Sequence, residues 1–214
     1  MARITVLGGT GYAGSNIVRE AVARGHQVTS YSRTAPAEPI EGVTHVSADV
    51  SHPDTHDRVV ADADVVVVAL SPRGDLEHTL RDVTAAVTAK AQQAGVRLGV
   101  VGGAGSLFVT DGGIKVIDAE WFPEAIKPEA RTMEDVLDDL RASDETLDWF
   151  YVSPAGGFGA WAVGERTGSY RTGGDVLLAD AEGNSFISGA DFGTAVVDEV
   201  EQAAHRRQRF TVAY

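Results

Sequence analysis

The chain has 214 residues, 43% of them hydrophobic and 23% charged, so it can bury a sizeable core without disulfides or a structural metal. It contains no cysteine, which excludes thiol catalysis and thiolate metal sites. The formal net charge of −13 repels a phosphate backbone, so we do not expect nucleic acid as a partner.

The sequence shows no apolar segment of membrane-spanning length, and a strand-like run follows directly on the first residues. We therefore expect a cytoplasmic protein with no membrane partner. Internal repeats, low-complexity tracts and linker-like segments are absent as well. We interpret residues 1–214 as a single domain, and its oligomeric state does not follow from the sequence.

The first part of the chain alternates between strand and helix patterns. Residues 3–8 form an apolar run rich in β-branched side chains, which is typical of a buried strand. From Tyr12, apolar positions recur at helical spacing until Gly25. The alternation continues with strands predicted at 26–32 and 43–50, a short helix after Pro53 and a strand at 63–71.

The middle of the chain repeats the same alternation. Its patterns predict helices at 76–95 and 129–143 and strands at 97–103 and 148–154. Unbroken runs of valine argue for a parallel sheet that is covered on both faces. Together these patterns predict an α/β fold, a doubly wound parallel sheet of the Rossmann type.

The last quarter of the chain is less regular. Residues 166–188 are rich in glycine and short strand-like pieces, with a turn at "DAEGNS". We interpret residues 155–190 as most of a lid on the substrate side. A helix at 191–205 and a closing strand at 209–214 are predicted to follow.

Three glycines stand at the junction of the first strand and the first helix. Gly8, Gly11 and Gly14 form G-x-x-G-x-x-G, at a place where a helix N-terminus offers free N–H groups to a pyrophosphate. One glycine would permit the turn, one would let phosphate approach the backbone, and one would let helix and strand pack closely. The alternative is a plain strand-to-helix turn.

The end of the second predicted strand bears on the choice of dinucleotide. A site for NAD usually places Asp or Glu there against the ribose 2′-hydroxyl. This chain has Arg33 instead, and a guanidinium can pair with a 2′-phosphate or stack on adenine. The residue favours NADP, and the alternative is a solvated surface arginine.

Several motifs together resemble one family. The segments "GGTGYAG", "SADV", "VVGGAGS" and "DWFYVSPAGGF", with the tail "RTGSYR", resemble the atypical short-chain dehydrogenase/reductases. Within that group the chain is most similar to the small NAD(P)H-binding flavin reductases of the biliverdin-IXβ reductase type. The resemblance implies the sheet order 3-2-1-4-5-6-7, with NADP along the carboxyl ends of the strands.

The resemblance also implies a place for each residue around the dinucleotide. The implied diphosphate loop consists of Gly8, Thr10, Gly11, Tyr12, Ala13 and Gly14. Arg33 would meet the 2′-phosphate, Asp49 and Val50 would bracket the adenine, and Ala69, Leu70 and Ser71 would line the ribose side. Gly102 and Gly103 would flank the nicotinamide, and Pro154 and Ala155 would cover its carboxamide end. Ser106 is the implied catalytic hydroxyl, unless a gap of one residue puts Gly105 at that position.

The chain departs from the wider superfamily in its lack of the catalytic Tyr-x-x-x-Lys. Four residues after Tyr12, Tyr31, Tyr151 and Tyr170 stand Asn16, Ala35, Ala155 and Gly174. Alcohol oxidation and carbonyl reduction normally need such a positioned acid or base. Reduction of a flavin does not, because its N5 accepts hydride directly and the proton can come from water.

These observations predict an NADPH-dependent reductase of a planar acceptor, with FMN or FAD as candidate substrates. Two alternatives remain: a non-catalytic redox sensor that binds NADP(H), and an epimerase or dehydratase that keeps its nicotinamide cofactor. For the acceptor site we expect Phe158 and Trp161, which could stack on a planar ring, and Tyr170, which faces either the pocket or the solvent.

His52 and His56 stand four residues apart near acidic residues, a spacing that could hold a metal on one helical face. An acidic helix start accounts for the same pattern, and we predict no metal site.

Overall fold

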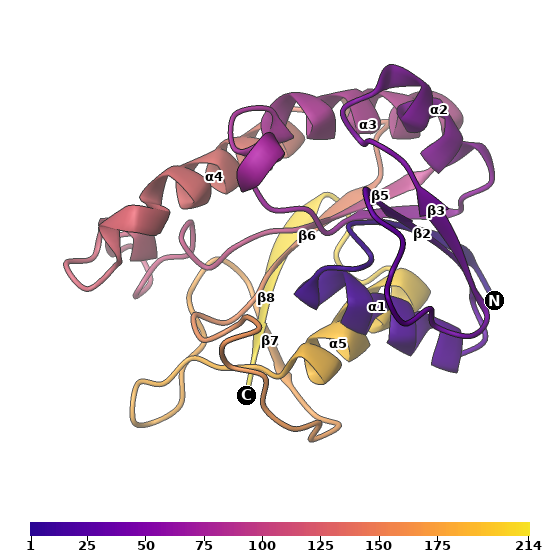
Figure 1. Cartoon of the computed structure of the whole chain (residues 1–214). Coiled ribbons are helices and arrows are strands. Elements are labelled where there is room, and N and C mark those ends of the chain that lie inside the picture. The colour runs from indigo at the N-terminus through magenta and orange to yellow at the C-terminus, as the bar shows by residue number, and fades with distance from the viewer.

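The computed structural model describes all residues, 1–214, and its strands form one eight-stranded sheet (Figure 1). The strands are β1 (Arg3–Leu7), β2 (Gln27–Ser32), β3 (Val43–Ser47), β4 (Val65–Val68), β5 (Arg97–Val101), β6 (Trp149–Ser153), β7 (Arg171–Gly173) and β8 (Gln208–Ala213). Their order is β3-β2-β1-β4-β5-β6-β8-β7. Every pairing is parallel except the one between β7 and β8.

The predicted fold class is confirmed, and the strand order differs by one edge strand. The closing strand predicted at 209–214 is β8, which pairs in parallel with β6 as the seventh strand of the predicted order. The additional strand β7 has three residues, Arg171–Gly173, and lies antiparallel at the edge. Its partner β8 lies about forty residues later in the chain, and a short glycine-containing segment carries no strand pattern of its own.

Five α-helices cover the two faces of the sheet. They are α1 (Tyr12–Ala23), α2 (Pro53–Ala61), α3 (Leu80–Ala94), α4 (Lys127–Arg141) and α5 (Gly189–Gln202). Helices α2, α3 and α4 lie on one face, and α1 and α5 lie side by side on the other (Figure 1). None of these helices combines the length and the apolar character that a membrane crossing requires.

The sheet separates two hydrophobic cores. In β4, Val66 and Val68 belong to the core under α2, α3 and α4, whereas Val65 and Val67 belong to the core under α1 and α5. All four side chains are buried, because both faces of a central parallel strand are covered. This arrangement explains the unbroken run of valine in the sequence.

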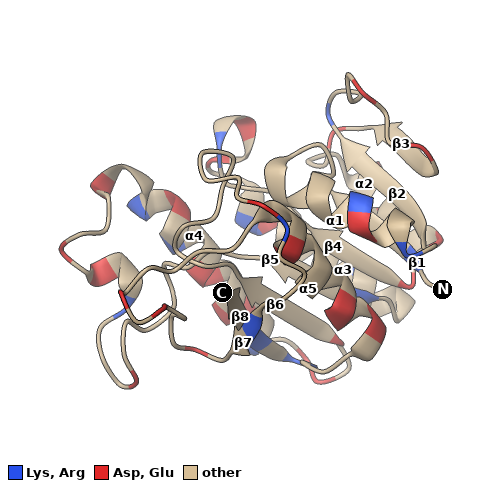
Figure 2. Cartoon of the chain, turned by 90° about the horizontal axis from the view of Figure 1, so that it is seen from below, with Lys and Arg blue, Asp and Glu red and all other residues tan.

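Positions of Lys and Arg and positions of Asp and Glu are interspersed along the helices and loops (Figure 2). On α4, Asp135 and Asp139 pair with Arg81 of α3, and Arg131 pairs with Asp118. The acidic face of α4 is thus partly neutralised by ion pairs within the chain. Such exposed pairs contribute little to stability, about 0–1 kcal/mol each.

Candidate functional site

The carboxyl ends of the parallel strands bring the predicted cofactor residues to one edge of the sheet. Leu7, the last residue of β1, pairs with Tyr31 of β2 on one side and Val68 of β4 on the other. The segments that leave β1, β2 and β4 therefore start side by side. The other predicted segments follow β3, β5 and β6 at the same edge.

The turn after β1 has no room for side chains at three positions. Gly8 has φ of +83°, and a Cβ atom there would lie 2.5 Å from the carbonyl oxygen of Ala69. A Cβ on Gly14 would lie 2.8 Å from the carbonyl carbon of Gly8. Gly9, which sequence reasoning did not single out, approaches the side chain of Ser30 equally closely. The glycines therefore let β1, α1 and β2 pack closely at this turn.

The N-terminus of α1 is open. Gly11 is its N-cap residue, is exposed, and provides no side-chain hydrogen bond to the helix. The first N–H groups of a helix have no partner within it, so here they are free to meet an anion. The N-terminus of α5 differs, because Ser188 accepts a hydrogen bond from the N–H of Asp191. The loop is therefore a cradle that fits a diphosphate.

Arg33 follows β2 directly and reaches over the same edge. Its guanidinium is 60% exposed and forms an ion pair with Asp75, in the short 3₁₀ turn Gly74–Leu76. Asp49 lies near it: hydrogen bonds from the hydroxyl and N–H of Ser51 hold the pKa of Asp49 below its ordinary value, and the charge of Arg33 adds to this effect. Arg33 is thus an exposed cation with two carboxylates in its neighbourhood.

Helix α2 holds the loop that carries Asp49 and Val50. The hydroxyl of Thr55 donates to the carbonyl oxygen of Asp49 at 2.7 Å. The buried ring of His56 places its Nε2 atom 2.7 Å from the carbonyl oxygen of Val50. Sequence reasoning considered His56 only as a metal ligand and missed this positioning role.

His52 caps α2, because its Nδ1 atom accepts a hydrogen bond from the N–H of Asp54. The structure holds no group of three or more His, Cys, Asp or Glu side chains arranged for a metal ion.

The loop after β5 lies against the ring of Tyr151. A Cβ on Gly102 would fall inside that ring, whereas a Cβ on Gly103 would meet no atom within 4 Å. The backbone at Gly103 therefore faces open space. Pro154 and Ala155, which follow β6, are buried.

Ser106 lies at the end of this loop and is held by a buried arginine. Nη1 of Arg209 in β8 donates to Oγ of Ser106 at 3.1 Å, and its Nε donates to Asp175 at 2.6 Å. Ser106 is 6% exposed and Arg209 7%. Because a guanidinium only donates, the hydroxyl hydrogen of Ser106 stays free to donate elsewhere. Sequence reasoning missed Arg209; the one available signal was an arginine within an otherwise apolar closing strand.

Phe158 and Trp161 occupy different environments in the lid. Phe158 packs between Tyr12 and Phe192, with ring centroids 5.2 and 4.4 Å away. Trp161 is 77% exposed. The hydroxyl of Tyr12 donates to the carbonyl oxygen of Val163 at 3.2 Å. The segment that we interpret as a lid therefore contacts the first turn of α1, and Trp161 is its most exposed aromatic side chain.

Tyr170 is not brought to this edge. Its hydroxyl donates to Asp198 in α5, which also pairs with Arg24 just beyond the C-terminus of α1. The N-terminus of α1 is about 18 Å from that end, at 1.5 Å per residue. Tyr170 therefore joins α1 and α5 on the helical face, remote from the diphosphate cradle.

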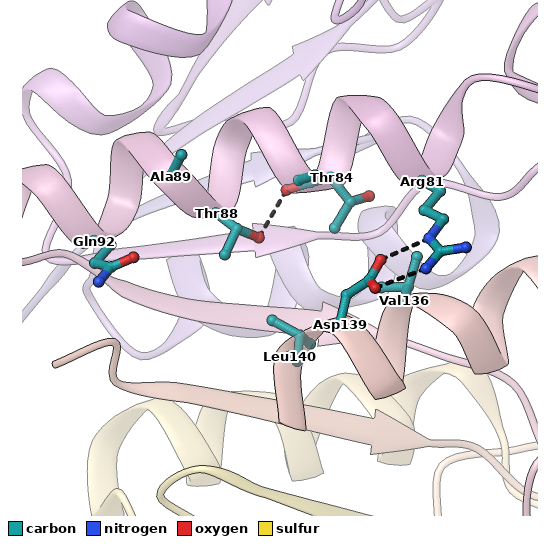
Figure 3. Close-up of a pocket in the computed structure, with 9 residues that line it drawn as sticks. Arg81, Thr84, Thr88, Ala89, Gln92, Val136, Asp139 and Leu140 are labelled. Carbon is teal, nitrogen blue, oxygen red and sulfur yellow. Dashed lines mark hydrogen bonds and ion pairs between the residues drawn. The ribbon is translucent and has the colours of Figure 1, made fainter. Parts of the chain in front are cut away.

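Two hollows lie outside the carboxyl edge. One of about 190 Å³ runs between α3 and α4 and is lined by nine residues, among them Arg81, Thr88 and Asp139 (Figure 3). Another of about 450 Å³ lies at the amino ends of β1 and β2, beside His26 and Thr44. Neither contains a predicted site residue, and ligands of open α/β sheets bind at the carboxyl ends.

A doubly wound parallel sheet, a glycine turn without room for side chains and an open helix N-terminus define a dinucleotide-binding Rossmann protein. A model of the NAD(P)H-binding family matches residues 8–203. The chain belongs to this NAD(P)H-binding oxidoreductase family, and the resemblance to atypical short-chain dehydrogenase/reductases is confirmed.

Three solved structures are similar over essentially the whole chain. A proposed NADH-flavin reductase from Streptococcus pneumoniae TIGR4 is 31% identical, with 100% of this chain and 99% of that chain covered and a TM-score of 0.86. A proposed epimerase from Bacteroides thetaiotaomicron is 34% identical, with 100% and 97% covered and a TM-score of 0.88. A proposed exported protein from Burkholderia pseudomallei is 40% identical, with 100% of both chains covered and a TM-score of 0.86.

Proposed function

We propose that the protein is an NADPH-dependent reductase that transfers hydride to a flavin or a similar planar acceptor. The observation that carries the proposal is that four of the five tyrosine hydroxyls already have hydrogen-bond partners within the chain. The hydroxyls of Tyr12, Tyr151, Tyr170 and Tyr214 donate to the Val163 carbonyl, the Met133 carbonyl, Asp198 and Asp191, respectively. Tyr31 is buried in the core under α2 and α3. Four of the five hydroxyls are thus engaged within the chain, and no lysine stands four residues after any tyrosine, so the acid–base pair that carbonyl reduction normally uses has no counterpart here.

A flavin acceptor removes that requirement. When bound, the reduced nicotinamide would supply a hydride, the flavin N5 would accept it, and water would supply the proton. The chain would contribute binding, orientation and exclusion of water. Ser106 remains the hydroxyl that we assign to the acceptor, because its hydrogen is free while Arg209 fixes its oxygen. The solved relative from Streptococcus pneumoniae, a proposed NADH-flavin reductase, supports the same acceptor class.

The assigned cofactor residues are those at the carboxyl edge. Gly8, Thr10, Gly11 and the first turn of α1 would bind the diphosphate, since the helix end is open there. Arg33 would bind the 2′-phosphate, which is the basis for preferring NADPH over NADH. Trp161 would stack on the acceptor, because it is the exposed aromatic side chain of the lid.

The test is consumption of reduced cofactor by the purified protein, followed by the loss of nicotinamide absorbance with FMN, FAD or a quinone added in turn. We expect turnover with a flavin, faster with NADPH than with NADH. Tight binding of NADPH without consumption by any acceptor would contradict the reductase proposal and favour a redox sensor.

A second candidate, a cofactor-retaining epimerase, is favoured by the likeness to the proposed epimerase from Bacteroides thetaiotaomicron. It predicts a rearranged product without net loss of NADPH. The engaged hydroxyls of Tyr12 and Tyr151 count against it, because neither is free to act as the acid or base that such a reaction requires.

We also propose a cytoplasmic location, because reduced nicotinamide cofactor is maintained inside the cell. The similar structure of a proposed exported protein makes this a point to test. Cell fractionation with an antibody against the chain would decide it, and recovery outside the cytoplasm would contradict the proposal.

A further inference from the structure

The ion pair between Arg33 and Asp75 crosses the cofactor edge of the sheet. Arg33 follows β2, and Asp75 lies in the segment between β4 and α3. In the sheet β1 lies between β2 and β4, so the pair spans the carboxyl end of the strand that carries the glycine turn. An adenosine entering between these loops would meet this pair.

Asp75 is not a freely moving partner. Its carbonyl oxygen accepts a hydrogen bond from the hydroxyl of Thr79 at 3.1 Å. Two residues before it, Arg73 pairs with Glu129 of α4 at 2.6 Å. Two ion pairs therefore hold this segment: Arg73 pairs with Glu129 of α4, and Asp75 pairs with Arg33, which follows β2.

The carboxylate of Asp75 and a ribose 2′-phosphate are anions that suit the same guanidinium. Both side chains of the pair are well exposed, 60% for Arg33 and 82% for Asp75, so the attraction between them is weak. A dianionic phosphate can displace the carboxylate from Arg33, but it then lies close to the negative charge of Asp75. NADH has no 2′-phosphate and leaves the pair intact.

We propose that Asp75 is a specificity-determining residue, an internal competitor that occupies Arg33 and lowers the preference for NADPH over NADH. This inference rests on the proposed function, because it assumes that Arg33 binds the 2′-phosphate. Removal of the carboxylate should free Arg33 and tighten NADPH binding without changing NADH binding.

The test compares dissociation constants for NADPH and NADH, measured by the fluorescence of the reduced nicotinamide, in Asp75→Asn and in the matched control Glu77→Gln. Glu77 lies in the same exposed segment but pairs with no residue in the structure. We expect Asp75→Asn to tighten NADPH binding about two- to five-fold, the range of an exposed ion pair, and to leave NADH unchanged. Glu77→Gln should change both cofactors little.

Arg33→Ala separates the failure of this inference from the failure of the proposed function. If Arg33→Ala leaves the ratio of NADPH to NADH affinity unchanged, the 2′-phosphate assignment itself is wrong. If Arg33→Ala lowers the ratio but Asp75→Asn behaves like Glu77→Gln, or weakens NADPH binding, the competitor role of Asp75 is wrong. In the Arg33→Ala background, Asp75→Asn should lose its effect on the ratio, since the two residues act through one contact.

Discussion

Gly14 in the first turn of α1 lies directly against the backbone of Gly8. A Cβ atom on Gly14 would stand 2.8 Å from the carbonyl carbon of Gly8 and 2.9 Å from the Cα of Gly9. Gly11, between them, differs: it is exposed, has φ of −73°, and a Cβ there would be 3.3 Å from the nearest atom. Two glycines of one motif therefore differ: Gly14 is required for packing, whereas Gly11 is open to solvent and is the one we propose a ligand approaches.

This difference predicts that one substitution lowers stability and that the other weakens cofactor binding. Gly14→Ala should lower the free energy of unfolding by about 1–3 kcal/mol, because backbone must move to accept the methyl group. Gly11→Val should keep the fold but weaken NADPH binding at least about ten-fold, because its side chain stands where phosphate approaches the helix. Urea unfolding and cofactor fluorescence measure the two effects. Normal NADPH binding by Gly11→Val would refute the assignment of the loop.

The parts of the site that sequence predicts depend on residues close together in the chain. The glycine turn is recognisable because a strand pattern changes to a helix pattern within a few residues of Gly8. Arg33 is recognisable because it directly follows the next strand. Parallel strands then bring such local signals to one edge of the sheet, so a correct fold class also predicts that these segments lie together.

The contacts that sequence does not predict join distant segments. Ser106 and Arg209 are 103 residues apart, and neither has a neighbour in the chain that signals the pair. Nothing in the glycine-rich sequence around Tyr170 signals a partner for its hydroxyl. Only the packed structure shows that this hydroxyl donates to Asp198. The position of a polar side chain depends on which elements pack together, which periodicity alone does not determine.

Arg209 is predicted to fix the loop that follows β5. Arg209→Met should lower the free energy of unfolding by about 2–3 kcal/mol, below the usual cost of breaking a buried pair because Asp175 is half exposed. Ser106→Ala removes one bond to a charged donor and should cost about 1–2 kcal/mol. Thermal and urea unfolding of both variants give these values. Equal stability of Arg209→Met and the parent chain would show that the pair contributes nothing.

Ser106→Ala also has a kinetic consequence. Loss of the hydroxyl should lower kcat/KM for the flavin about five- to ten-fold, the worth of one hydrogen bond, with the dissociation constant of NADPH unchanged. The shape of the pH–rate profile should stay the same, because water supplies the proton. A changed profile would instead identify Ser106 as a proton donor.

We expect substitutions of the aromatic residues in the lid to affect the acceptor KM differently, according to where each side chain lies. Trp161→Ala should raise KM for the acceptor several-fold and leave NADPH binding unchanged, because Trp161 is exposed and stands two residues before Val163, which bonds Tyr12. Tyr170→Phe is the matched control: its hydroxyl bonds Asp198 on the helical face, so the acceptor KM should not change. Steady-state kinetics with FMN measure both. An effect of Tyr170→Phe as large as that of Trp161→Ala would contradict this division.

We expect the stability of the lid to depend on pH through the carboxyl group of Asp191. Burial acts to raise its pKa, but hydrogen bonds from the N–H groups of Thr167 and Gly168 and from the hydroxyls of Thr167 and Tyr214 outweigh burial, and the pKa is lowered. A carboxyl group whose pKa is lower in the folded state stabilises the fold above its unfolded value of about 3.9. That stabilisation is lost as the pH falls from about 5 through the unfolded value toward the folded one.

Asp191→Asn should therefore lower the free energy of unfolding at pH 7 by about 1.5–3 kcal/mol and flatten its pH dependence below pH 5. The amides of Thr167 and Gly168 should also exchange hydrogen faster, because Asp191 accepts from both, at 2.7 and 2.9 Å. Asp180→Asn is the control, since the pKa of Asp180 is also lowered but its side chain lies in an exposed turn. If Asp191→Asn keeps the parent slope between pH 3 and 5, the acid sensitivity lies elsewhere and the lid is held by its packing against Tyr12 and Phe192.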